Sequence, residues 1–176
     1  MREWVPTSAS ARGRLVHAAL DAFGRRPYAD VSVSDLAAAA ATTTGPLYHH
    51  FGSKLGLYAV VRGDVERRVV DRIEGAMAAA AAAGVHTPDA LASALTIAFD
   101  YVVSAGFTAM LAEQRPDRAG DPITAALAAA MTGSGSDVTA AMLAAAWRAA
   151  LATVADSGDP QQARAAVAGI RIASGG

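Results

Sequence analysis

The residues with the clearest chemical potential lie in one short segment, residues 43–51 of a 176-residue chain. Its candidate contact residues are Thr43, Thr44, Gly45, Pro46, Tyr48 and His49. Small residues at the start of a helix allow its backbone to come close to another molecule. A threonine methyl or a proline ring can contact the methyl group of thymine, and hydroxyl or imidazole groups can reach bases and phosphates. This chemistry suits the major groove of DNA.

Two expected helices position this segment. Ser32 is predicted to cap a helix that runs to about Ala40, and Asp35 three residues later completes a capping-box pattern. Thr43 is the expected N-cap of the next helix, which ends at Gly52. Two short helices joined by a tight polar turn form the layout of a helix-turn-helix, here over about residues 32–51.

Phosphate groups are a second expected contact. The helix N-termini at Ser32, Thr43 and Ser53 favour anions through their unpaired N–H groups and the helix dipole. Ser34 lies in the first turn of the helix capped by Ser32, and Lys54, the only lysine of the chain, follows Ser53. In the alternative interpretation, Lys54 is a solvated surface charge and Tyr48 only covers a small core.

A first helix completes this unit. Ser10 is its expected cap, and an apolar stripe that includes Leu15 and Phe23 runs to about residue 25. Leu36 and Leu47 are expected to pack onto this stripe and to form a three-helix core.

These motifs resemble the N-terminal domain of TetR-family transcriptional regulators. The carrying residues are TTGPLYHHF at 43–51 and Ser53-Lys54, and the resemblance covers about residues 11–60. It implies a DNA-binding domain at 10–53 and a helical ligand-binding and dimerisation domain at 54–176. By position, Thr44, Gly45, Pro46 and Tyr48 resemble groove-facing residues, and Thr43, Tyr48, His49 and Lys54 resemble backbone-contacting ones.

Two positions depart from the family pattern. Ala41 stands at a turn position that is usually glycine, and Thr44 stands where lysine or arginine is frequent. We therefore expect a larger contribution to DNA binding from an N-terminal arm with Arg2, Arg12 and Arg14.

Composition limits the remaining possibilities. Hydrophobic residues make up 53% of the chain, much of it alanine, and we find no alternating strand pattern, so the expected fold class is all-α. The absence of cysteine excludes disulfides, Cys-ligated zinc and thiol catalysis. The net charge of −1 divides into +3 for residues 1–72 and −4 for residues 73–176, which favours an N-terminal part that faces nucleic acid.

The C-terminal part is expected to consist of helices. A long helix, about residues 54–83, would link the two halves. Further helices are predicted at 88–104, 107–114, 123–131, 138–155 and 160–173, with a flexible TGSGSD linker at 132–137.

Bulky side chains are few in this alanine-rich part, so we expect them to line any ligand pocket. The candidates are Met77, Phe99, Tyr101, Phe107, Met110, Met142 and Trp147. In the alternative interpretation they simply fill the core. The resemblance implies an effector, a small molecule of unknown identity.

The helix at 138–155 is apolar on nearly every side, which predicts that a partner covers part of it. We therefore expect a homodimer through the last two helices, with Ile170 and Ile172 contributing. In the alternative, this helix is buried within a single chain.

The resulting hypothesis is a TetR-like regulator, a repressor released from a palindromic double-stranded DNA operator by a small ligand. One alternative is a degenerate regulator that acts through protein–protein contact. Another is a small helical enzyme using His86, Asp100 or Glu113, although no catalytic or metal-ligand spacing supports it. No cofactor and no metal are expected. We found neither a signal peptide nor a window of 18 strongly apolar residues, which predicts a cytoplasmic protein without membrane contact.

Overall fold

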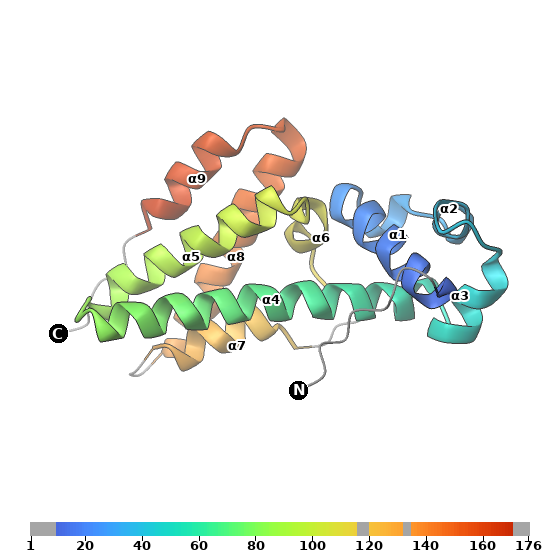
Figure 1. Ribbon diagram of the computed structural model, residues 1–176. Helices are drawn as coiled ribbons and strands as arrows, with labels where there is room; N and C mark the ends of the chain where they lie inside the picture. Colours follow the sequence, from blue (N-terminus) through green and yellow to red (C-terminus); the bar gives the residue numbers. More distant parts are fainter. Residues whose placement is uncertain (1–9, 116–119, 132–134, 171–176) are drawn as a thin grey trace.

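The computed structural model describes residues 10–115, 120–131 and 135–170. It is 81% helical, and no strand occurs within these ranges, which confirms the all-α prediction. A small head of three helices lies at one end, a long helix runs along the molecule, and the remaining helices pack along its other part (Figure 1). The expected contributions of Arg2 and Ile172 lie outside the described residues.

The head contains α1 (Ala11–Arg25), α2 (Val33–Ala39) and α3 (Thr44–Phe51), with a short 3₁₀ turn, η1 (Tyr28–Asp30), after α1. Two predicted caps are confirmed. The Ser10 hydroxyl accepts from the Gly13 N–H at 3.0 Å, and Ser32 and Asp35 form the reciprocal capping box. Four apolar side chains close the core of the head with no exposed surface: Leu15, Phe23, Leu36 and Leu47.

Helix α4 (Lys54–Ala82) joins the head to the rest of the molecule. Its 29 residues span about 44 Å. The Ser53 hydroxyl caps it by accepting from the Gly56 N–H at 3.0 Å, as predicted. One buried stripe of α4, from Leu57 to Ile73, contributes to both the head and the C-terminal bundle. The division into domains at residue 53 stays a prediction, because α4 packs against both parts.

The C-terminal bundle contains α5 (Thr87–Ser104), α6 (Thr108–Ala112), α7 (Pro122–Ala129), α8 (Ser136–Ser157) and α9 (Pro160–Ala168). Helix α8 is longer at both ends than predicted and includes the last two residues of the expected linker. Gly135 and Gly158 flank it with left-handed backbone angles, φ 84° and 73°. Since glycine adopts this conformation without steric cost, these two residues set the limits of α8.

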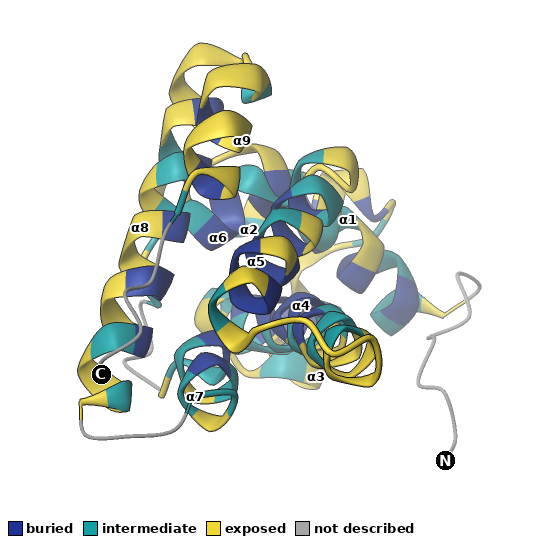
Figure 2. Cartoon of the chain, turned by 90° about the vertical axis from the view of Figure 1, so that its left-hand side faces the viewer, coloured by how far each residue is buried: buried dark blue, intermediate teal, exposed yellow. Residues whose placement is uncertain are grey.

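Helix α8 has an unusual surface. By length and composition it could cross a membrane, with a mean hydropathy of 1.5, although core helices of soluble proteins pass the same test. No window of strongly apolar residues marks this helix in the sequence, because alanine supplies most of its hydropathy. Its buried residues face the bundle, while its outer side is exposed (Figure 2). The indole N–H of Trp147 donates to the Leu95 carbonyl at 3.1 Å and anchors the inner side to α5.

The head and the bundle meet closely where α1 reaches the α5–α6 turn. A Cβ atom at Gly24 would lie 2.3 Å from the carbonyl oxygen of Gly106, so only glycine fits at this contact. Beside it, the rings of Phe23, Tyr28 and Tyr58 form an aromatic cluster, with centroid separations of 4.9 to 5.9 Å. The head is therefore packed against the bundle, with no flexible linker between them.

Candidate functional site

The outward surface of α3 carries most of the predicted contact residues. Thr44, Gly45 and His49 are exposed, and Tyr48 exposes 54% of its surface although it is a large aromatic residue. Leu47, on the opposite side of the same helix, has no exposed surface and holds α3 onto the head. Pro46 is half-buried between these two sides. Helix α3 thus presents one small, polar and aromatic face to solvent.

The turn before α3 contains the departure from the family pattern. Ala41 has φ 48°, in the left-handed region, and is the only non-glycine residue with positive φ in the described ranges. A side chain in this conformation costs about 1–2 kcal/mol, which explains why glycine is usual there. Thr43 occupies the predicted N-cap position with an extended backbone, but its side chain makes no capping hydrogen bond.

Lys54 is engaged inside the protein. Its ammonium group donates to the carbonyls of Tyr28 and Val31, both at 2.9 Å, and lies 4.0 Å from the centre of the Tyr28 ring. These contacts tie the start of α4 to the segment before α2. The structure therefore gives Lys54 a positioning role, and the expected phosphate contact stays a prediction.

The remaining polar candidates differ in their surroundings. Ser34 is exposed, whereas the Ser32 hydroxyl is already used by the capping box. The hydrogen bonds from Ser32 lower the pKa of the Asp35 carboxyl. Arg12 and Arg14 lie within α1 and do not form a free arm: Arg14 donates to the Ala40 carbonyl at 2.9 Å, and Arg12 lies over the ring of Phe51.

Most of the bulky residues expected to line a ligand pocket lie in the core or at the surface. Phe99, Met110 and Trp147 have no exposed surface and belong to the hydrophobic core. Met142 points outward, with 68% exposed. Met77, Tyr101 and Phe107 are partly buried against the core, and Phe107 also lines a small cleft of about 230 Å³ between α1 and the α5–α6 turn. Bulky apolar side chains give the largest gain on burial, so in a bundle built mainly from alanine they fill the core first. The core positions of Phe99, Met110 and Trp147 agree with the alternative interpretation, and a role of any of the seven residues in ligand binding stays a prediction.

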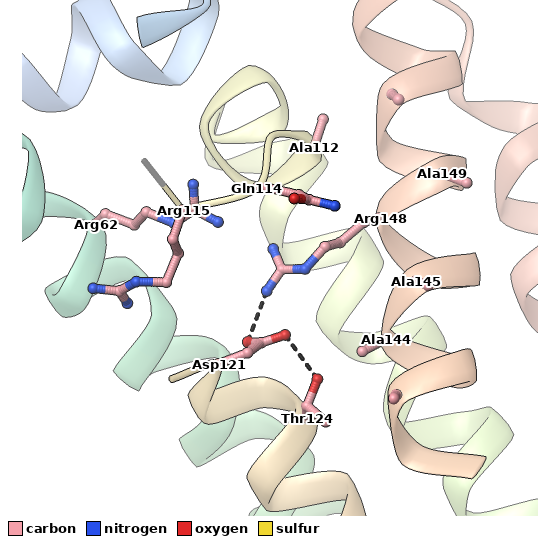
Figure 3. A pocket seen from close by; sticks show the side chains of 12 residues that line it. Arg62, Ala112, Gln114, Arg115, Asp121, Thr124, Ala144, Ala145, Arg148 and Ala149 are labelled. Carbon is pink, nitrogen blue, oxygen red and sulfur yellow. Dashed lines mark hydrogen bonds and ion pairs between the residues drawn. The ribbon is translucent and has the colours of Figure 1, made fainter. Parts of the chain in front are cut away.

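A cleft of about 710 Å³ opens instead between α4, the α6–α7 segment, α7 and α8. One wall is the alanine-rich side of α8, with Ala144, Ala145 and Ala149 (Figure 3). The lining also contains charged side chains that were not among the predicted site residues: Arg62, Arg115 and Asp121 on the other walls, and Arg148 on α8 itself.

The floor of the cleft holds a buried ion pair. Arg62 and Glu66, one turn apart on α4, expose 1% and 0% of their side chains and lie 2.8 Å apart. Arg62 also donates to the Tyr58 hydroxyl and to the Glu113 carbonyl, both at 2.8 Å. Arg115 binds the second carboxylate oxygen of Glu66. The position of Arg62 and Glu66 among the buried residues of α4 was the available hint, since charged groups are rarely buried unless paired.

The rim of the cleft holds a second ion pair, from Arg148 of α8 to Asp121 at the start of α7, at 2.8 Å. Asp121 also accepts hydrogen bonds from Thr124 at 2.7 Å and from the Ile123 N–H at 3.1 Å. Burial alone would raise the pKa of Asp121, but Arg148 and these hydrogen bonds lower it below its ordinary value. Asp121 is therefore ionised at neutral pH.

The three-helix head with its exposed third helix defines the class of helix-turn-helix DNA-binding domains. Residues 15–61 match the family model described as "Bacterial regulatory proteins, tetR family". This part of the chain is therefore similar to the N-terminal domain of TetR-family transcriptional regulators. Regulators of this family are generally non-enzymatic, soluble DNA-binding proteins. No cluster of three metal-ligating side chains occurs among the described residues.

Solved structures share the whole fold. A TetR-family regulator from Pectobacterium atrosepticum aligns over 95% of this chain and 92% of its own, at 20% identity and a TM-score of 0.64. One from Streptomyces coelicolor aligns over 90% and 77%, at 16% identity and a TM-score of 0.59. A gamma-butyrolactone receptor, an ArpA-like protein, aligns over 93% and 95%, at 19% identity and a TM-score of 0.54. No curated protein matches the chain by sequence.

Proposed function

We propose that this protein is a homodimeric repressor that binds a near-palindromic operator and is released from it by a small ligand. The observation that carries the proposal is the exposed face of α3. Tyr48 is more than half exposed on a helix that Leu47, which has no exposed surface, holds onto the head, and Thr44 and Gly45 leave the start of the helix open to close approach. Such a face suits contacts with base edges and thymine methyl groups.

DNA binding is tested with the full-length protein. Duplexes selected from a random library are labelled, and their affinity is measured by fluorescence anisotropy at several salt concentrations. Tyr48→Ala and Thr44→Ala are expected to weaken binding about tenfold or more, because each base contact contributes about 1–3 kcal/mol. Val85→Ala, an exposed residue near the far end of α4, is the control. Failure to enrich any sequence, or equal affinity of all variants, would overturn the proposal.

The outer side of α8 supports the dimer. Val138 and Met142 expose 65% and 68% of their surface on a helix that otherwise carries mainly alanine there. Alanine allows two helices to approach closely, and a second copy of α8 and α9 would cover this apolar side. A two-fold axis would place two α3 helices in successive major grooves, about one turn of DNA apart.

The oligomeric state is measured by analytical ultracentrifugation. The wild-type protein is expected to sediment as a dimer, and Met142→Lys to shift it towards monomer, because a buried unpaired ammonium group opposes association. Ile97→Lys introduces the same charge at an exposed site on α5 and is expected to leave the dimer intact. A monomeric wild-type protein would contradict the dimer.

Ligand control is supported by the open cleft and by similar structures. One is titled a gamma-butyrolactone receptor, and another is the repressor AlkX from a Dietzia strain, implicated in n-alkane biodegradation, at 20% identity and a TM-score of 0.50. A cleft of about 710 Å³ lies within the size range of small-molecule sites. Release of the selected DNA by a compound that binds the bundle is the expected result, and DNA binding insensitive to every bound compound would refute ligand control.

A further inference from the structure

Among the described residues that line the C-terminal cleft, three are arginines, Arg62, Arg115 and Arg148, and one is acidic, Asp121. Glu66, buried beneath them, pairs with Arg62 and Arg115, while Arg148 pairs with Asp121. Because these groups are partly or fully buried, water and salt screen their charges less than they would at the surface. The described lining therefore favours a negatively charged group on a ligand.

The donors of the cleft are not equally available. Arg62 uses three of its five N–H groups, on Glu66, Tyr58 and Glu113, and is fixed in the floor. Arg148 uses two, on the Leu111 carbonyl and on Asp121, both at 2.8 Å. Its guanidinium group lies in the space between α7 and α8 (Figure 3). Since a guanidinium presents N–H groups in a planar fork, Arg148 retains donors suited to a carboxylate.

Apart from Arg148, the α8 side of the cleft has no polar side chain. It is formed there by five alanines, of which Ala144, Ala145 and Ala149 are labelled in Figure 3. Alanine methyl groups can only contribute apolar contact. A ligand that fits both the guanidinium group of Arg148 and the alanine side of α8 has a single acidic head and an apolar body.

We propose that the cleft binds a small monocarboxylic acid with a hydrocarbon body. Its carboxylate is received by Arg148, with Arg115 adding positive potential, and its body lies along the alanine side of α8. Asp121 competes for Arg148, so the ligand must displace or share that ion pair. This inference rests on the proposed ligand control and specifies the chemical class of the ligand.

Isothermal titration calorimetry with the full-length dimer tests the inference at neutral pH. The probes are butanoate, octanoate and dodecanoate, each with its matched primary amide and amine. We expect at least one carboxylate to bind about tenfold more tightly than its amide, and the amines not to bind. Equal affinity for an acid and its amide, or no binding of any acid, would overturn the proposal.

Two variants separate ligand contact from loss of folding. Arg148→Gln is expected to weaken carboxylate binding about tenfold and to leave amide binding unchanged. Asp121→Asn removes the competing anion but keeps an N-cap side chain for α7, so carboxylate binding should strengthen several-fold. Arg164→Gln, on α9 and paired with Asp100, is the control and should change nothing. If Arg148→Gln and Asp121→Asn both weaken binding, the pair is structural and the proposal fails.

The same proteins distinguish this inference from the proposed function. Carboxylates that bind without releasing DNA would support the ligand class and contradict ligand control. Release of DNA by a neutral lactone, with no binding of any acid, would support ligand control and overturn the ligand class.

Discussion

Replacement of Lys54 by methionine distinguishes a structural role of this residue from a contact with DNA phosphate. The sequence alone does not separate these two roles. The side chain keeps its length but loses the ammonium group and both hydrogen bonds, to the carbonyls of Tyr28 and Val31 at 2.9 Å. Hydrogen bonds from a charged group contribute roughly 1.5–3 kcal/mol each. Lys54 is half-buried, so water can replace part of that interaction. We expect a loss of about 2 kcal/mol in the free energy of unfolding, which corresponds to a Tm lower by about 4–8 °C.

The salt dependence of DNA binding measures the second role. A cation that contacts one phosphate contributes about 0.9 to the slope of log affinity against log salt concentration. If Lys54 positions α2 and α4 without touching DNA, Lys54→Met lowers Tm and weakens binding but leaves this slope unchanged. Differential scanning calorimetry and anisotropy titrations give the two quantities on the same sample. An unchanged Tm with a slope reduced by about 0.9 would refute the positioning role.

Arg67→Met is the matched control for this experiment. It removes a cation from the same helix, but Arg67 is 68% exposed and pairs only at the surface with Asp64. Exposed ion pairs contribute about 0–1 kcal/mol. We therefore expect little change in Tm and none in the slope.

Three further predictions concern backbone fit and pH. Ala41→Gly should raise Tm by about 1–2 °C, because relief of the left-handed strain exceeds the added chain entropy by about 0.5 kcal/mol. Gly24→Ala should lower the free energy of unfolding by about 1–3 kcal/mol, since its methyl group would lie 2.3 Å from the Gly106 carbonyl oxygen. Gly63→Ala is the control: it has open space around it and should stabilise α4 by up to about 1 kcal/mol. Chemical denaturation compares the two variants, and equal effects would contradict the close contact at Gly24. The pKa of Asp121 lies below its ordinary value, so its stabilisation is present at neutral pH and is lost as the pH falls through that lowered pKa. Acid unfolding of Asp121→Asn should accordingly depend less steeply on pH, and an identical pH profile would contradict this.

Local chemistry made the head predictable. Ser10, Ser32 and Ser53 each cap the helix that the sequence assigned to them, because a cap depends only on residues within three positions. The start of α5 was predicted less well: the sequence placed the first helical residue at Pro88, whereas the structure begins the helix one residue earlier, at Thr87, after His86. There Thr87 and Pro88 both fit the first turn, and sequence spacing does not distinguish the cap from the first helical residue.

The cleft could not be predicted in the same way. Its ion pairs join residues far apart in the chain, such as Arg148 with Asp121, and alanine carries no directional information about which face of a helix is buried. A side chain in the core and one at a pocket wall are both apolar in the sequence. Phe99 and Trp147 were assigned to a pocket for this reason, although packing places them in the core.

One set of contacts connects this cleft with the head. Arg62 lines the cleft and donates to the Tyr58 hydroxyl at 2.8 Å. The Tyr58 ring packs edge-on against Phe23 of α1 and against Tyr28, each at 4.9 Å between centroids. The carbonyl of Tyr28 in turn accepts from Lys54, so each step from the cleft to the start of α4 is a direct contact.

This continuity gives the cleft a physical means of influencing α3. A carboxylate that draws Arg115 away from Glu66 changes the partners of Arg62, because the two arginines share that one buried carboxylate. A buried carboxylate that loses one cation binds the other more strongly, and the geometry at Tyr58 then changes with it. Coupling through these contacts has a required result: the ligand and the operator must each weaken the binding of the other by the same factor.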